Sequence, residues 1–222
     1  MAYMWREIGQ ILLGLWRGLR GKSDPGQKLL GLVIVATIPV IAAGFLMKEY
    51  FGGNIRSVEV TAWAFIGFGL LLFAADKMSL TVRQMDHMGF GAAAYIGLAQ
   101  VLALIPGTSR AGITMTAARS LGYERRDAAR FSMLLAIPAI AGAGALLGHD
   151  VYKAGDVRLG QDAILAAAIA FVTAFVAIAL MMAWLKRASF TPFVIYRVLF
   201  GIFLLLWVYG AFSGWLPAPK SL

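Results

Sequence analysis

The feature that most constrains this chain is a series of apolar stretches, each of about 18 residues or more, separated by short polar loops. Stretches of this length match the hydrocarbon layer of a bilayer and predict helices that span a membrane. The composition agrees: 60% of the 222 residues are hydrophobic and 14% are charged, whereas about a quarter of the residues in soluble domains are charged. We therefore predict an all-α polytopic membrane protein.

The cysteine content and the net charge exclude several functions. The chain contains no cysteine, which rules out disulfides, thiolate metal sites and thiol nucleophiles. Its net charge of +9 is spread over the loops and does not predict a nucleic-acid partner. We attribute the basic residues to orientation in the membrane.

Five membrane spans are predicted in one membrane domain. They cover residues 29–47, 59–75, 128–147, 161–185 and 193–212. Residues 1–28 are expected to form an interfacial segment, because apolar residues recur there at helical spacing with basic residues between them. The apolar residues are Trp5, Ile8, Ile11, Leu12, Leu15, Trp16 and Leu19.

The region 89–121 has a different pattern. Two apolar pieces, 89–105 and 110–121, are both short for a crossing and are separated by Pro106-Gly107-Thr108-Ser109. This break predicts a re-entrant hairpin whose irregular backbone is buried in protein or lines a cavity. With the N-terminus inside, a hairpin puts thirteen loop cations inside and five outside, whereas a single crossing gives ten and eight. The excess of positive charge expected inside favours the hairpin.

Two arginines lie within apolar segments and are candidate anion ligands, because an intramembrane charge normally faces a partner or a wet cavity. Arg110 follows the Pro-Gly break, where Thr108 or Ser109 is expected to cap the next helix. A helix N-terminus beside a guanidinium is suited to bind phosphate. The alternative is a plain turn and cap, with Arg110 and Arg197 reaching the membrane interface as anchors.

Further candidates surround this break. Thr114 lies four residues after Arg110 and shares its helical face, while Gln100 adds an amide six residues before Pro106. We assign Gly107 and Thr108, in the break itself, to the same phosphate-binding group.

The acidic residues and histidines offer no partner for this group. All eleven Asp and Glu residues fall in loops or at span ends, so the apolar interior contains no obvious general base. His87 and His149 have no partner at a metal-ligand spacing, and no metal site is predicted from them.

Three motifs resemble the bacterial undecaprenyl-diphosphate phosphatases, the bacitracin-resistance family. Residues 106–114 are similar to its Pro-Gly-x-Ser-Arg-Ser-Gly-x-Thr signature, 130–138 to its Phe-Ser-x-Leu-Leu-Ala-x-Pro stretch, and 189–197 to a later motif. The resemblance extends over nearly the whole chain.

The resemblance implies a multi-pass phosphatase of the bacterial cytoplasmic membrane. It would remove one phosphate from undecaprenyl diphosphate, recycle the lipid carrier of cell-wall precursors and confer bacitracin resistance. It also implies two inverted repeats, each a hairpin plus three spans, with Arg110 on the diphosphate and Arg197 on an arginine of the later motif. A divalent cation, Mg²⁺ or Ca²⁺, is implied without identifiable ligands, and a homodimer is left open.

The sequence departs from the family pattern at two places. Ala111 stands where the family commonly has a second serine, and the family's glutamate-rich and Ser-Ser-x-Gly-His motifs do not occur. We therefore expect residues 29–75 to be the last two spans of a truncated first repeat and 89–212 to be the second repeat. The absent hairpin would supply the acid/base groups.

These departures leave the activity and the nucleophile open. The nucleophile is Ser109, a serine of the absent hairpin or water, and the shortened chain is either active or inactive. One alternative function is a non-catalytic protein that binds or translocates polyprenyl phosphate; another is a remnant without activity.

Overall fold

The computed structural model describes residues 4–18, 24–51, 57–154 and 157–210. Its regular elements are helices, which confirms the predicted all-α class. They are α1 (Trp5–Gly18), α2 (Pro25–Phe51), α3 (Val58–Met78), η2 (Met85–His87), α4 (Phe90–Val101), η3 (Leu102–Leu104), α5 (Arg110–Ser120), α6 (Arg125–Ala154), α7 (Val157–Trp184) and α8 (Thr191–Val208).

Four of these helices are long and apolar enough to cross a membrane, which confirms a polytopic membrane protein. They contain the apolar stretches Pro25–Met47, Val58–Met78, Ala163–Trp184 and Thr191–Val208. The remaining predicted span, 128–147, lies within the single 30-residue helix α6. A helix of that length extends about 45 Å, at about 1.5 Å per residue.

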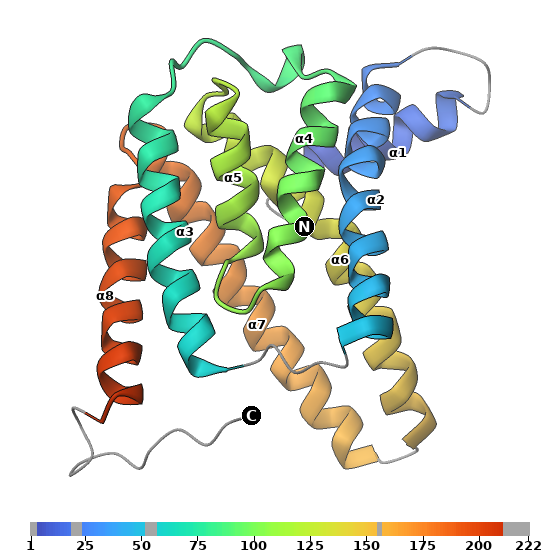
Figure 1. Cartoon of the computed structure of the whole chain (residues 1–222). Coiled ribbons are helices and arrows are strands. Elements are labelled where there is room, and N and C mark those ends of the chain that lie inside the picture. The colour runs from blue at the N-terminus through green and yellow to red at the C-terminus, as the bar shows by residue number, and fades with distance from the viewer. Residues whose placement is uncertain (1–3, 19–23, 52–56, 155–156, 211–222) are drawn as a thin grey trace.

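The region 89–121 forms the predicted hairpin. Helices α4 and α5 pack against each other and are joined by η3 and a short loop. Figure 1 shows the apex of this hairpin part of the way along the flanking helices, while its two outer ends lie at one end of the molecule. The hairpin therefore enters and leaves at the same end.

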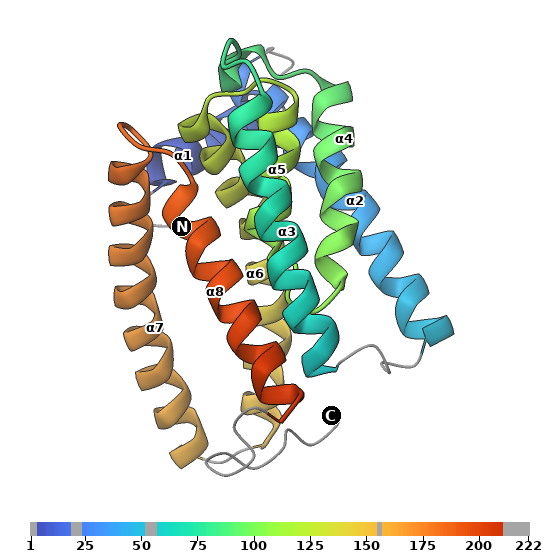
Figure 2. The same cartoon turned by 60° about the vertical axis from the view of Figure 1, so that its left-hand side comes forward.

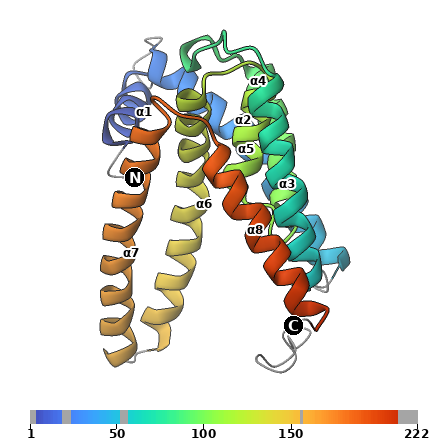
Figure 3. The same ribbon diagram turned by 90° about the vertical axis from the view of Figure 1, so that its left-hand side faces the viewer.

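Longer helices surround the hairpin. Helix α2 packs against α4, α3 against both α5 and α8, and α6 against α5. Figure 2 shows α8 beside α3, and Figure 3 shows α6 and α7 on the other side. Helices α2 and α4 approach closely at Gly97, because a Cβ there would lie 2.5 Å from the Ala36 carbonyl oxygen. Small residues permit such contacts between membrane helices.

Helix α1 has the exposure expected of an interfacial segment. It lies across the long helices, at the end where the hairpin enters (Figure 1). Trp5, Leu12 and Trp16 are exposed, while Glu7 forms a 2.7 Å ion pair with Arg130 of α6. A helix with one exposed apolar face and one tethered face suits the membrane surface.

The loops predicted to lie inside gather at the same end. The connections that precede α4, α6 and α8 lie near α1 in Figures 1 and 3, and they carry Arg83 and Lys186. Four cations of the charge count, namely Arg20, Lys22, Arg56 and Lys220, lie outside the described residues.

Candidate functional site

The hairpin apex is held close to α3. Gly107 has a φ of 88°, a left-handed conformation that glycine adopts without a steric penalty. A Cβ at this position would collide with the carbonyl oxygen of Thr61 in α3. The Pro-Gly break thus places the apex backbone directly against a neighbouring helix.

Ser109 caps the N-terminus of helix α5. Its Oγ accepts a 3.2 Å hydrogen bond from the Gly112 N–H, which confirms that one of the two expected residues caps this helix and identifies it as Ser109. Ser109 has a φ of 65°, which is uncommon for a residue with a side chain. The preceding Thr108 is fully buried, and its Oγ1 has no hydrogen-bond partner.

Arg197 reaches the apex from α8. Its Nη2 donates hydrogen bonds of 2.8 Å to the Gly107 carbonyl and 2.9 Å to the Thr108 carbonyl. The guanidinium lies over the Phe65 ring, 5.0 Å from its centroid. Only 8% of Arg197 is exposed, so the alternative of a headgroup anchor is wrong for this residue. Its Nε has no partner.

Arg110 lies on the other side of the apex. Its Nη1 donates a long 3.5 Å hydrogen bond to the Leu135 carbonyl of α6, and the residue is half-buried. Within the described part of the chain, neither Arg110 nor Arg197 forms an ion pair with a carboxylate. Both cations therefore retain donors for an anion.

The remaining two predicted phosphate ligands, Thr114 and Gln100, lie away from the apex surface. The Thr114 hydroxyl lies 2.7 Å from the Ser132 Oγ and donates to the Arg110 carbonyl at 2.9 Å, so it joins α5 to α6. Gln100 is buried in α4 with its Oε1 unpartnered. Their roles as phosphate ligands stay predictions. The Ser132 contact was missed, although this serine falls within the second recognised motif.

An apolar pocket adjoins Ser109 and Arg197. Its volume is about 310 Å³. The other lining residues are Phe65, Leu72, Ala111, Gly112, Met115, Met181, Phe190, Phe193 and Tyr196. An apolar cavity with a cation and a hydroxyl at its edge suits a molecule that is part hydrocarbon and part anion.

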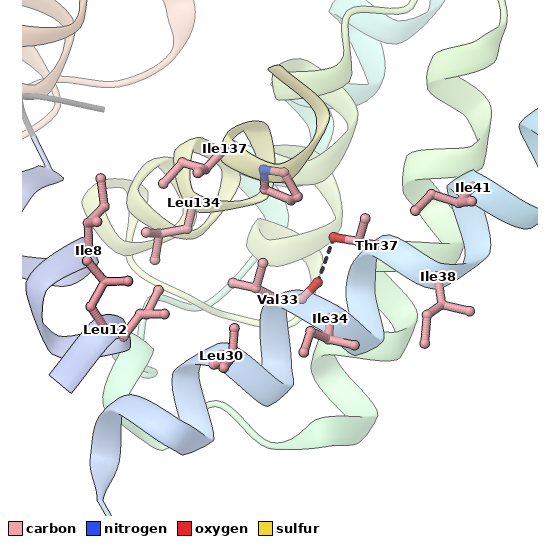
Figure 4. Close-up of a pocket in the computed structure, with 12 residues that line it drawn as sticks. Ile8, Leu12, Leu30, Val33, Ile34, Thr37, Ile38, Ile41, Leu134 and Ile137 are labelled. Carbon is pink, nitrogen blue, oxygen red and sulfur yellow. Dashed lines mark hydrogen bonds between the residues drawn. The ribbon is translucent and has the colours of Figure 1, made fainter. Parts of the chain in front are cut away.

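A second cavity, between α1, α2 and α6, has no such chemistry. It has a volume of about 400 Å³ and is lined by aliphatic side chains with Thr37. Figure 4 shows that the Thr37 hydroxyl is engaged by its own helix, donating to the Val33 carbonyl at 2.7 Å. We therefore assign the candidate site to the apex.

The sequence reasoning also missed an ion cluster at the base of the hairpin. The thirteen inside cations of the loop-charge count include Arg119, and this assignment is wrong, because Arg119 lies in the last turn of α5 and is fully buried. Its Nε lies 3.1 Å from Asp76 Oδ1, which also accepts from Arg125 Nε at 2.7 Å. Arg119 also donates to the Thr81 hydroxyl and to the Tyr123 carbonyl. The sequence signal for this ion pair was an acidic residue, Asp76, at the end of one span and an arginine, Arg119, at the end of the hairpin.

The described residues do not fit the divalent cation that the resemblance implies. Among them, no three His, Cys, Asp or Glu side chains gather to form a metal site. Mg²⁺ and Ca²⁺ prefer carboxylate and carbonyl oxygens, but the Gly107 and Thr108 carbonyls of the apex already accept hydrogen bonds from the cationic Arg197.

The fold and site define a class of polytopic membrane proteins with an arginine-flanked hairpin apex between their spans. The chain belongs to the bacitracin resistance protein BacA family, whose model matches residues 1–203.

Named relatives agree with this assignment. Undecaprenyl-diphosphatase 1 of Rhodospirillum rubrum is 49% identical over 209 residues, which are 93% of this chain and 74% of that protein. The undecaprenyl-diphosphatases of Roseobacter denitrificans and a Jannaschia species are 47% and 46% identical over 212 residues. Each of these two alignments covers 95% of this chain and 79% of the relative.

Proposed function

We propose that this chain hydrolyses undecaprenyl diphosphate to undecaprenyl phosphate and inorganic phosphate in the bacterial cytoplasmic membrane. This activity recycles the lipid carrier of the cell wall and confers resistance to bacitracin. Membership of the BacA family and the names of the relatives support the proposal. The apolar pocket beside Ser109 and Arg197 suits the polyprenyl part of such a substrate.

The observation that carries the proposal is that Arg110 and Arg197 form no ion pair with a carboxylate of the described residues. A guanidinium inside a membrane is costly and is retained where it meets a charge of opposite sign. Arg110 and Arg197 flank a helix N-terminus, which itself favours anions. Together they suit a diphosphate, whose negative charge exceeds that of a single phosphate.

The reaction that we propose is attack by water on the terminal phosphorus. A bond forms between the water oxygen and this phosphorus, and the bond from the phosphorus to the bridging oxygen breaks. Undecaprenyl phosphate leaves with the bridging oxygen, one proton of the water stays on the inorganic phosphate, and the other passes to solvent. Arg110 and the free N–H groups at the start of α5 stabilise the charge that develops on the phosphate oxygens. Arg197 holds the Gly107 and Thr108 carbonyls so that the apex keeps its shape.

Ser109 serves this reaction as the cap of α5. Its Oγ accepts a hydrogen bond from the Gly112 N–H, and no hydrogen bond joins it to a histidine or carboxylate of the described residues. A serine nucleophile requires an adjacent base. We therefore propose water as the nucleophile and assign Ser109 to the geometry of the apex.

The test is phosphate release from undecaprenyl diphosphate by the purified chain. Arg110→Ala should lower kcat/KM by about 10²–10³-fold, the typical loss on removing one donor to a developing oxyanion. The matched control is Arg187→Ala, which removes an exposed arginine from the loop between α7 and α8. Substrate binding without phosphate release would instead support the non-catalytic binding or translocating protein, and neither binding nor release would support the remnant.

A further inference from the structure

A polar pocket lies at the opposite end of α5 from the apex. It has a volume of about 290 Å³, and the lining residues come from the loop after α3, the start of α6 and the loop after α7. They are Thr81, Glu124, Arg125, Arg126, Leu185 and Lys186. Helix α5 has eleven residues and is about 16 Å long at about 1.5 Å per residue, and no residue lines both this pocket and the pocket at the apex. The pocket is therefore distinct from the candidate site.

The pocket has a surplus of positive charge. Arg125 uses its Nε for the Asp76 ion pair while 34% of its side chain stays exposed. Arg126 and Lys186 are exposed and form no ion pair among the described residues. Glu124, the carboxylate in the lining, accepts a 3.4 Å hydrogen bond from Gln84. Three cations thus face one acid.

The walls of the pocket are fixed by buried contacts. Leu185 is buried and packs in an apolar cluster with Leu72, Met115 and Phe190. The Thr81 hydroxyl accepts a 3.1 Å hydrogen bond from the buried Arg119, which also bonds to Asp76. Leu185 and Thr81 are therefore held in place next to the three cations, and Arg125, Arg126 and Lys186 line the same pocket.

We propose that this pocket binds a phosphate group between Arg125, Arg126 and Lys186. The phosphate belongs either to the headgroup of an anionic phospholipid or to free inorganic phosphate. Guanidinium groups match phosphate oxygens by paired hydrogen bonds, and a lysine adds a compact charge. The pocket lies at the end where the basic loops gather, and basic clusters there meet the anionic headgroups of the inner leaflet.

The lipid source is tested by native mass spectrometry of the purified chain with phosphatidylglycerol or phosphatidylcholine. The test variant is the double substitution Arg126→Gln with Lys186→Gln. The control is Arg83→Gln with Arg187→Gln, which removes the same charge from exposed residues outside the pocket. Each cation that bonds directly to the lipid phosphate contributes about tenfold in affinity, the factor that about 1.4 kcal/mol represents. The test variant should therefore bind phosphatidylglycerol about 100-fold more weakly, whereas the control, whose residues do not line the pocket, should lose much less.

The free-phosphate source is tested by titrating inorganic phosphate, followed by ³¹P NMR. All variants in this arm also carry Arg110→Ala, so that binding at the apex does not contribute. A loss of either anion in the test variant alone supports the proposal and identifies the source. Equal binding of the two lipids with no phosphate difference between test and control overturns it, as does an equal loss in both variants. No arm measures hydrolysis, so the outcome is independent of the proposed enzyme activity.

Discussion

The two ends of helix α5 hold their arginines in opposite ways. At the base of the hairpin, Arg119 is fully buried and is bonded to Asp76, Thr81 and Tyr123. At the apex, Arg110 makes one long contact with a carbonyl. Arg110 and Arg119 are nine positions apart on one short helix, yet one has bonding partners for its donors and the other keeps donors free.

This difference distinguishes arginines that stabilise the fold from arginines that can bind a ligand. A buried ion pair with all its donors occupied has no capacity left for a ligand, and its removal leaves an isolated charge. The apex, in contrast, keeps unpartnered polar atoms on Thr108 and Arg197 in a buried setting. Buried unsatisfied groups are costly, and they are expected where a protein binds a ligand.

The largest effect is expected at the base. Asp76→Asn removes the countercharge of the buried Arg119 and of Arg125, and breaking a buried pair in this way costs about 3–5 kcal/mol. For a chain of this size, Tm should fall by about 2–4 °C for each kcal/mol. Thermal unfolding followed by tryptophan fluorescence measures this, with the exposed Asp86→Asn as the control. Equal Tm values for the two variants would contradict a structural role for the cluster.

Substitutions of the two apex arginines should both lower kcat/KM, but only the substitution of Arg197 should also lower Tm. Arg110→Ala is expected to lower kcat/KM by about 10²–10³-fold, and Arg197→Ala by about 10²-fold, because the apex that positions the phosphate loses its support. Arg197→Ala should also lower Tm, because the Gly107 and Thr108 carbonyls lose their donor and each unsatisfied group costs about 1–3 kcal/mol. Arg110→Ala should leave Tm nearly unchanged. A large loss of Tm in Arg110→Ala would contradict the conclusion that Arg119 stabilises the fold whereas Arg110 does not.

Helix α4 of the hairpin contains two glycines, Gly91 and Gly97, whose replacement by alanine should have different steric effects. Gly97→Ala forces a Cβ against the Ala36 backbone, whereas a Cβ at Gly91 on the same helix meets nothing within 4 Å. Overpacking of this kind costs about 1–3 kcal/mol. We expect Gly97→Ala to lower Tm and Gly91→Ala to leave it unchanged or slightly raised. If the two variants unfold together, the close contact of α2 and α4 does not hold the hairpin.

Substitutions of Ser109 test whether this residue acts as a helix cap or as the nucleophile. As a helix cap it should contribute about 1 kcal/mol, so Ser109→Ala should lower Tm slightly and activity by about tenfold or less, the factor that 1.4 kcal/mol represents. Ser109→Asn should restore much of both, because asparagine caps helices and tolerates positive φ. A loss as complete as that of Arg110→Ala, with no recovery in Ser109→Asn, would show that the serine is the nucleophile.

The spans and the hairpin could be predicted from sequence because their causes are local. Apolar length predicts the spans, and the Pro-Gly break with the loop charges predicts the hairpin. The bonds from Arg197 to the apex could not be predicted, since they join residues 90 and 89 positions apart. The sequence showed that Arg197 was costly in a membrane, but not which carbonyls it meets.

The misjudged position of Arg119 has a related physical reason. An arginine near a span end is compatible with exposure in a loop, and its burial depends on Asp76 arriving from a helix 43 positions away. Thr114 was placed on the correct helical face, but Ser132 of α6 determines where its hydroxyl bonds. Helix periodicity gives the direction of a side chain, and only packing gives its partner.

The smallest effect is expected at an exposed ion pair, the surface counterpart of the buried base. Asp24 accepts hydrogen bonds from the Gly26 N–H and from Arg17 at the end of α1, and these interactions lower the pKa of Asp24 below its usual value. A lowered pKa means that the pair contributes fully above the usual Asp pKa of about 3.9 and is lost as the pH falls through the folded value. Tm should therefore decline slightly more steeply with acid below about pH 4 in the parent chain than in Asp24→Asn. Because Arg17 is largely exposed, added salt should reduce the difference, whereas the destabilisation by Asp76→Asn should persist in salt. A salt response of the same size at both sites would mean that burial does not distinguish the two ion pairs.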